Sequence, residues 1–225
     1  MLSNLFLGKL NFTSAIIYII SSLVVIFLTL PIHEMAHGFA AVKLGDNTPK
    51  WQGRLTLNPF AHIDYMGALF ILLFGFGWAK PVQVNVYNFR KPKRDMAITA
   101  LAGPLSNIIV AFVFYIVLYA LSVFSTELTG VTFYIYLFST FLVRINISLA
   151  VFNLIPIPPL DGSRILTAIL PDRIYYKIMQ YERYIYLGFL LLLFTNVLDV
   201  PINSLTNLFI YLFYGICRGI FSIFM

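Results

Sequence analysis

Charge and cysteine are both scarce in this sequence. Asp, Glu, Lys and Arg make up only 11% of its 225 residues and Cys217 is the single cysteine, whereas 60% of the residues are hydrophobic. The mean hydropathy is +0.87. Soluble domains average about 45–50% apolar residues, so the composition excludes an ordinary soluble protein, and a lone cysteine excludes an internal disulfide. We therefore expect an integral membrane protein in which residues 1–225 form one domain.

Acidic residues are scarcer than basic ones, 9 against 15, which leaves a net charge of +6. In a soluble protein this excess would raise nucleic acid as a partner. Here the basic residues flank apolar segments and gather in residues 43–54, 80–94 and 164–183, while 125–130 and 199–203 contain none. We interpret Arg90, Lys91, Lys93 and Arg94 as a solvated loop that faces the headgroups of a lipid bilayer, and we predict no nucleic-acid partner. The positive-inside rule then places the three basic segments in the cytoplasm.

Long apolar runs, one of which contains Arg144, predict about four to five membrane spans. Residues 12–32 are too long for a signal-peptide core and continue in a helical pattern to Leu44, with Pro31 expected to bend the helix. Residues 97–124 and 131–155 are the next spans, and 184–198 and 202–216 are shorter candidates. Because the first span is followed by a cytoplasmic basic segment, the amino terminus lies outside the cell. Residues 33–37 then lie toward the cytoplasmic side of the cell (plasma) membrane.

Three shorter segments carry other patterns. Residues 67–78 are apolar but too short to cross a bilayer, which predicts a re-entrant segment. Residues 54–58 and 81–86 alternate between apolar and polar side chains, which predicts two short β-strands whose free edge could bind an extended substrate segment. The predicted fold class is thus an all-α membrane protein. It is a polytopic transmembrane helix bundle with a re-entrant segment and short membrane-associated β-strands.

One cluster of ionisable residues stands out. The chain has only three histidines and three glutamates, yet His33, Glu34 and His37 fall within five positions. On a helix, positions i and i+4 share a face about one 5.4 Å turn apart, so the two imidazoles can bind one metal ion. Glu34 lies beside them, where it can reach the attacking water. This is the H-E-x-x-H pattern of zinc peptidases.

A catalytic zinc ion needs a third protein ligand and an open position for water. Asp161 is favoured, because it follows a proline-broken helix end on the predicted cytoplasmic side and precedes Gly162. It could instead cap the helix that starts near Ser163, and the ligand would then be His62 or Asp64. The other acidic candidates lie on the opposite side of the predicted topology or among basic residues that can pair with them: Glu127, Asp199, Asp95 and Glu182.

Three stretches in this order resemble the signature motifs of the site-2 protease family of intramembrane zinc metalloproteases: HEMAH at residues 33–37, AGPLSN at 102–107 and NLIPIPPLDG at 153–162. GRLTLNP at 53–59 and GWAKPV at 77–82 are similar to the compact branch of that family, which lacks a PDZ domain. The resemblance implies a zinc metalloendopeptidase. Its expected reaction is hydrolysis of a peptide bond in or near a transmembrane segment of a membrane protein substrate.

The resemblance also implies roles for individual residues. His33, His37 and Asp161 would hold one Zn²⁺ per chain, and Glu34 would be the general base that takes a proton from the zinc-activated water. Asn107 and Asn153 could position the substrate or its oxyanion, or could instead form hydrogen bonds between helices.

Other functions use similar residues. A membrane transporter also places His and Asp within spans, but transporters usually contain internal repeats, and none is visible in this sequence. A non-catalytic metal-binding membrane scaffold would need a fourth protein ligand and would tolerate the loss of Glu34. A prenyl-type peptidase would require a glutamate ligand, for which Glu182 is the cytoplasmic candidate. The sequence carries no signal for the oligomeric state.

Overall fold

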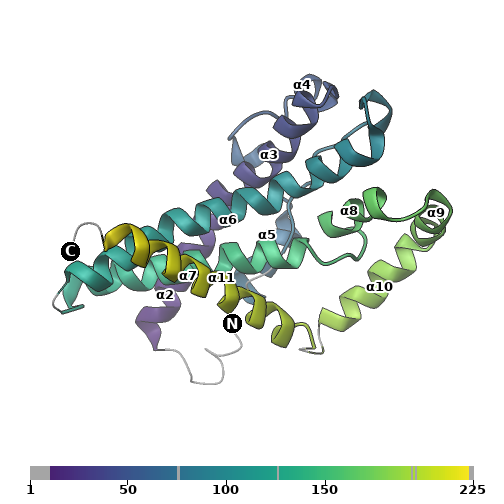
Figure 1. Ribbon diagram of the computed structural model, residues 1–225. Coiled ribbons are helices and arrows are strands. Elements are labelled where there is room, and N and C mark those ends of the chain that lie inside the picture. Colours follow the sequence, from purple (N-terminus) through teal and green to yellow (C-terminus); the bar gives the residue numbers. More distant parts are fainter. Residues whose placement is uncertain (1–10, 75–76, 126, 194, 196, 223–225) are drawn as a thin grey trace.

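The computed structural model describes residues 11–74, 77–125, 127–193, 195 and 197–222, and the regular secondary structure of these residues is helical (Figure 1). Among these described residues, four helical segments are long and apolar enough to cross a membrane: Phe12–Lys43, α6 (Pro92–Phe124), α7 (Gly130–Asn153) and α11 (Asp199–Phe221). The prediction of an all-α, multi-span membrane protein is therefore confirmed.

The first span contains an irregular turn in its middle. It consists of α2 (Phe12–Val24), a π-helical turn η1 (Val25–Thr29) and α3 (Leu30–Lys43), and the N–H of Leu30 bonds to the carbonyl of Val25, five residues earlier. The next residue is Pro31, whose ring would clash with the carbonyl of Phe27 in a regular α-helix. A wider π turn relieves such a clash. The irregularity predicted from Pro31 thus lies in the turn just before it, and α3 follows with His33 and His37.

Helix α6 packs against α3, α7, α8 (Asp161–Ile169) and α11. Its buried positions recur every four residues, at Gly103, Asn107, Ala111, Tyr115 and Tyr119. The side chains on another face of the helix are exposed and apolar: Leu105, Ile109, Val113 and Val117. This pattern suits a helix that has protein on one side and lipid on the other. Figure 1 shows α6 running beside α7 and α11 through the length of the bundle.

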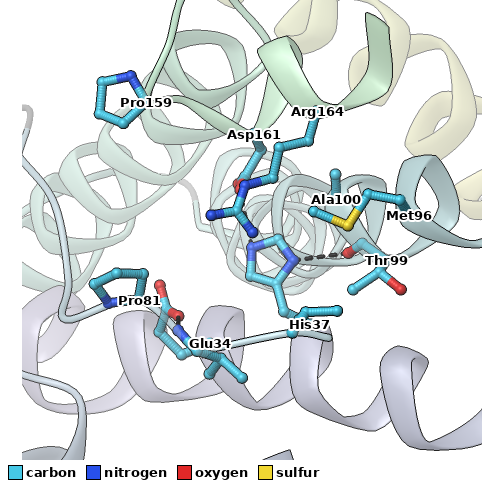
Figure 2. A pocket seen from close by; sticks show the side chains of 11 residues that line it. Glu34, His37, Pro81, Met96, Thr99, Ala100, Pro159, Asp161 and Arg164 are labelled. Carbon is cyan, nitrogen blue, oxygen red and sulfur yellow. Dashed lines mark hydrogen bonds and ion pairs between the residues drawn. The ribbon is translucent and has the colours of Figure 1, made fainter. Parts of the chain in front are cut away.

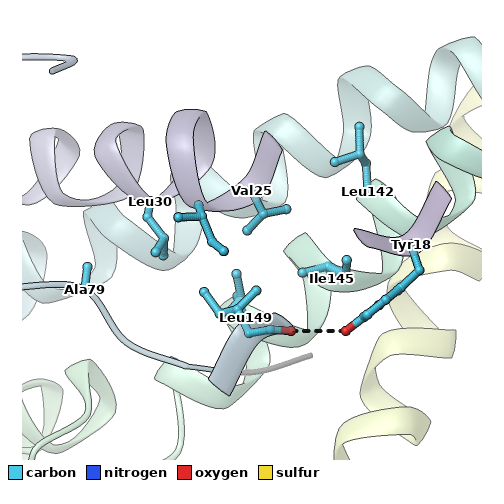
Figure 3. Close-up of a cluster of buried hydrophobic side chains, with 9 residues drawn as sticks. Tyr18, Val25, Leu30, Ala79, Leu142, Ile145 and Leu149 are labelled. Carbon is cyan, nitrogen blue, oxygen red and sulfur yellow. Dashed lines mark hydrogen bonds between the residues drawn. The ribbon is translucent and has the colours of Figure 1, made fainter. Parts of the chain in front are cut away.

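A buried apolar cluster holds the first span in place (Figure 3). It joins Tyr18, Val25 and Leu30 of the first span to Leu142, Ile145 and Leu149 of α7. The Tyr18 hydroxyl also donates a 3.1 Å hydrogen bond to the carbonyl of Ile71 in α5 (Tyr65–Phe74). The start of α3 is therefore fixed against two other helices.

The prediction of β-strands at residues 54–58 and 81–86 is wrong, because the structure has no strand there. In both segments, backbone groups that would pair with a neighbouring strand in a sheet form hydrogen bonds with side chains instead. Val82 N–H donates to Glu34 Oε2 at 2.9 Å and Asn85 N–H donates to Asp46 Oδ2 at 2.7 Å. The carbonyl of Thr56 contacts the ring of His62. The expected strand edge for an extended substrate is therefore absent from these two segments.

The short helices between the first span and α6 are α4 (Thr48–Trp51), η2 (Pro59–Ala61), α5 and η3 (Val86–Asn88). The structure does not support the predicted re-entrant segment at residues 67–78. It describes α5, whose 10 residues form a helix about 15 Å long. The chain beyond α5 packs against the start of this helix so closely that a Cβ on Gly67 would overlap the backbone of Trp78.

One of the last two predicted spans agrees with the structure, since residues 202–216 lie within α11, which is long and apolar enough to cross a membrane. The other does not. After α8 come α9 (Asp172–Gln180) and α10 (Glu182–Leu193), and α10, with 12 residues, is not among the candidate spans in the described part of the chain, so the span predicted at residues 184–198 is not supported. Leu198 and Ile202, at the start of α11, pack near Phe152 and Leu160. Asp199 therefore lies at the Asp161 end of α7. Its predicted position on the opposite side is wrong.

Candidate active site

The H-E-x-x-H residues lie in the first turns of α3 and are all buried. His33 and His37 are one helical turn apart, and their Nε2 atoms approach to 3.1 Å. Glu34 belongs to the same group, since its carboxylate and the two imidazoles offer ligand atoms within 4.8 Å of one another. The predicted convergence of the two histidines is thus present in the structure.

Asp161 reaches the two histidines from α8. Its Oδ2 lies 3.3 Å from Nε2 of His33 and 3.2 Å from Nε2 of His37. Asp161 is the first residue of α8, and the chain before it is folded so tightly that a Cβ on Gly162 would overlap the carbonyl oxygens of Leu154 and Ile155. Glycine at position 162 is therefore what allows the α7–α8 connection to deliver Asp161 to the histidines.

The ionisation of Asp161 suits a metal ligand. Burial alone would raise the pKa of its carboxyl group, but the charge and hydrogen bonds of His37 and His33 outweigh burial and hold that pKa well below its usual range. The group is therefore a carboxylate at neutral pH, the form that coordinates metal ions.

The three atoms fit a zinc ion. They form a triangle with edges of 3.1, 3.2 and 3.3 Å. Tetrahedral zinc with bonds of about 2.0–2.1 Å separates its ligand atoms by about 3.3–3.4 Å. Oδ2 of Asp161 is also buried, and its described polar neighbours are the two Nε2 atoms. Two imidazoles and one carboxylate are a donor set that leaves one position open, as in catalytic zinc sites.

Helix α6 orients the histidines. Nδ1 of His37 lies 2.7 Å from the backbone carbonyl of Thr99. When Nδ1 carries the proton and donates it to this carbonyl, Nε2 is left with the free lone pair that a metal requires. One turn further along α6, a Cβ on Gly103 would lie only 2.6 Å from Nε2 of His33. The absence of a side chain at Gly103 thus lets α6 lie directly against both imidazoles.

A cavity of about 50 Å³, enough for a few water molecules, adjoins this triangle (Figure 2). Its polar side chains are Glu34, His37, Thr99, Asp161 and Arg164, and the rest of its lining is apolar: Pro81, Val82, Val84, Met96, Ala100 and Pro159. Glu34 accepts the N–H of Val82 at 2.9 Å, which fixes the direction of its carboxylate. The cavity therefore offers an acid–base group, a candidate metal site and a cation within one small space.

The alternative ligands have other roles in the structure. His62 is buried in its own loop, where Nε2 lies 2.9 Å from the Thr56 carbonyl, and Asp64 accepts the N–H of Gly67 at the start of α5. Asp95 accepts a hydrogen bond from the backbone N–H of Lys91 and pairs with the side chain of Arg94, a pairing that the basic surroundings predicted. The two remaining glutamates are also elsewhere, since Glu182 lines a different pocket and Glu127 precedes the far end of α7.

The two asparagines do not line the cavity. Asn153 donates to the carbonyl of Leu149 within its own helix at 3.0 Å. Asn107 is buried, and no hydrogen bond is described for either polar atom of its side chain. Sequence reasoning assigned no role to Arg164, although its position three residues after Asp161 places the two side chains on one helix face. That spacing was the signal by which Arg164 could have been found.

Comparison with known proteins agrees with the metal-binding arrangement of His33, His37 and Asp161 described above. The profile of Peptidase family M50 matches residues 130–195, which include Asp161. YwhC of Bacillus subtilis strain 168, named as a candidate zinc metalloprotease, is 40% identical over 185 residues, covering 79% of this chain and 80% of YwhC. A relative with the same description from Methanocaldococcus jannaschii is 31% identical over 154 residues, covering 68% of this chain and 72% of the relative. No solved structure matches at a significant level.

Proposed function

Because the chain belongs to peptidase family M50, we propose that it is an intramembrane zinc metalloendopeptidase that hydrolyses a peptide bond in or near a transmembrane segment of a membrane protein. The observation that carries this proposal is the triangle formed by His33, His37 and Asp161 beside Glu34, in one cavity. We assign the three residues of the triangle as ligands of one Zn²⁺ per chain, and Glu34 as the general base.

Zinc, when bound, lowers the pKa of water and polarises a carbonyl group. Glu34 takes a proton from the attacking water as the water oxygen forms its bond to the carbonyl carbon, and the carbonyl π pair moves onto oxygen. When that pair returns, the C–N bond breaks and Glu34 passes its proton to the leaving amine. Glu34 is suited to this role because it lines the cavity and is held by the Val82 N–H.

A catalytic role explains the site better than a structural metal site does. Structural zinc sites normally have four protein ligands. Beyond Asp161, the acidic side chain grouped with the histidine pair among the residues that the structure describes is Glu34, which lines the cavity and accepts the N–H of Val82. A scaffold would not require a small water-accessible cavity next to three ligands, whereas a hydrolase does.

The location of the site in the membrane is also part of the proposal. The basic segments 43–54, 80–94 and 164–183 follow the first span, precede α6 and follow α7, and the site lies toward these ends of the three spans. By the positive-inside rule these segments face the cytoplasm. We therefore assign the active site to the cytoplasmic side of the plasma membrane, where water reaches it over a short path.

The test combines metal content with a search for cut sites. Native protein, Glu34→Gln and Asp161→Ala are reconstituted in liposomes with extracted membrane proteins of the same organism, and new amino termini are labelled and sequenced. We expect termini within transmembrane segments for native protein alone, and one zinc per chain in native protein and Glu34→Gln but not in Asp161→Ala. Equal cutting by Glu34→Gln, or a native protein without zinc, would refute the proposal.

A further inference from the structure

The cavity contains one polar group whose chemistry the proposed mechanism leaves unused. Glu34 and Asp161 are carboxylates, and Nδ1 of His37 is directed to the Thr99 carbonyl. Arg164 is the permanent cation among the residues described as lining the cavity. A guanidinium group carries five N–H donors in a rigid fork and stays charged at any physiological pH. Hydrolysis places a new negative charge in this space, on the oxygen of the attacked carbonyl.

The position of Arg164 is fixed by the same helix that delivers Asp161. The two residues are three apart in the first turns of α8, so their side chains leave the helix on one face. Figure 2 shows the Arg164 side chain extending from α8 into the cavity toward His37, beside Asp161. Its long stem lets the head group reach over the cavity while the helix backbone stays fixed.

The other groups that could donate to the carbonyl oxygen of the substrate form other hydrogen bonds or lie outside the cavity. The amide of Asn153 donates within α7, and Asn107 does not line the cavity. The N–H of Val82 is already bonded to Glu34. Of the side chains described around the cavity, Arg164 is the one that combines a permanent positive charge with five N–H donors, a combination suited to an oxygen that becomes negative.

We propose that Arg164 is a further catalytic residue, which donates hydrogen bonds from its guanidinium group to the carbonyl oxygen of the scissile peptide bond as that oxygen becomes negative. This inference rests on the proposed peptidase function. No proton is transferred, since Arg164 stays charged throughout. Its contribution is electrostatic and is larger in the transition state than in the bound substrate.

The first test is the kinetics of Arg164→Gln on the best-cut peptide from the experiment above. Removing one donor to an oxyanion typically lowers kcat about 10²- to 10³-fold, and we expect this loss with KM changed by less than about threefold. Zinc content should stay native. Arg173→Gln is the matched control, because Arg173 is exposed on α9 and lies outside the cavity, and it should keep native kcat.

The second test does not require turnover. A phosphinic peptide of the same sequence places a tetrahedral anion where the scissile amide stands. Its dissociation constant, measured on zinc-loaded protein, should rise for Arg164→Gln by the factor by which kcat/KM falls. Arg164→Lys, which keeps the charge but loses the fork, should give a smaller rise and supplies the same comparison if Arg164→Gln does not fold.

The outcomes separate the two proposals. Unchanged kcat, or unchanged phosphinate affinity, in the Arg164 variants would overturn the catalytic role while native cleavage and the Glu34→Gln control left the peptidase function intact. Loss of zinc from Arg164→Gln would also overturn it, and would make Arg164 a positioning residue for Asp161. If native protein and Arg173→Gln cut nothing, the proposed function itself fails and this inference fails with it, a result distinct from native cutting with unchanged Arg164 variants.

Discussion

Replacing Gly103 by alanine should abolish tight zinc binding without touching a ligand. An added Cβ would lie 2.6 Å from Nε2 of His33, 2.5 Å from Cε1 of His37, and closer still to Nε2 of His37. These atoms belong to rigid rings packed inside the bundle, and both rings are buried. The added methyl group therefore crowds the two Nε2 atoms that we assign as zinc ligands.

The size of the effect follows from these distances. Ordinary contact between such atoms is about 3.5 Å, so either α6 or the two rings must move by about 1 Å. Metal–ligand distances tolerate about 0.2 Å, several times less than this displacement. Changes in residues that only orient ligands already cost about 10- to 100-fold in metal affinity. We expect Gly103→Ala to lose about 100-fold or more, equivalent to about 2.8 kcal/mol.

The measurement is a zinc titration against a competing chelator in detergent, with circular dichroism to check that helix content is unchanged. Gly215→Ala is the control, since Gly215 is an exposed helical glycine of α11 with nothing within 4 Å of an added Cβ. That variant should bind zinc natively and gain up to about 1 kcal/mol in helix propensity. Native zinc affinity in Gly103→Ala would show that α6 does not lie against the histidines.

Two further predictions concern aspartates. Asp161→Ala should lose zinc, whereas Asp64→Ala should keep it and cost only about 1 kcal/mol of stability as a lost helix cap, both measured by metal content and thermal unfolding. Burial raises the pKa of Asp46, but hydrogen bonds from Thr48, Asn88 and Asn85 outweigh burial and lower it. Its stabilisation is therefore complete above the unfolded pKa of about 3.9 and is lost as pH falls through the folded pKa. Asp46→Asn should unfold at lower temperature than native protein at pH 7, and this difference should shrink below pH 4. A difference that does not depend on pH would contradict the assignment.

Local features of the sequence were sufficient to predict much of the fold and of the candidate site. The pairing of His33 and His37 depends only on helix geometry, and the three long spans before residue 154 depend on long apolar runs, so both were predictable. Asp161 could be favoured from its place after a broken helix. Its approach to the histidines could not be derived, because it depends on how Gly162 packs against the preceding turn.

The wrong predictions have a common physical cause. Alternating side chains at residues 81–86 indicate an extended chain, but they do not reveal what its N–H groups bond to, and here two of them bond to the carboxylates of Glu34 and Asp46. The prediction of a span at residues 184–198 was wrong for a similar reason. Apolar content in residues 184–198 was sufficient for a span, but the helix there ends after 12 residues, and the chain starts α11 beside Leu160. Both outcomes depend on long-range contacts.

These contacts make α6 the element on which the site depends most, although it supplies none of the three proposed ligands. It packs against both α3, which carries the histidines, and α8, which carries Asp161. Thr99 directs the ring of His37 and Gly103, one turn later on the same face, allows the two rings to approach. A small shift of α6 would therefore change the distance between ligands that come from separate parts of the chain. The 3.2–3.3 Å separations between Asp161 and the histidines are thus a property of helix packing around α6, and the short AGPLSN stretch belongs to the site for that reason.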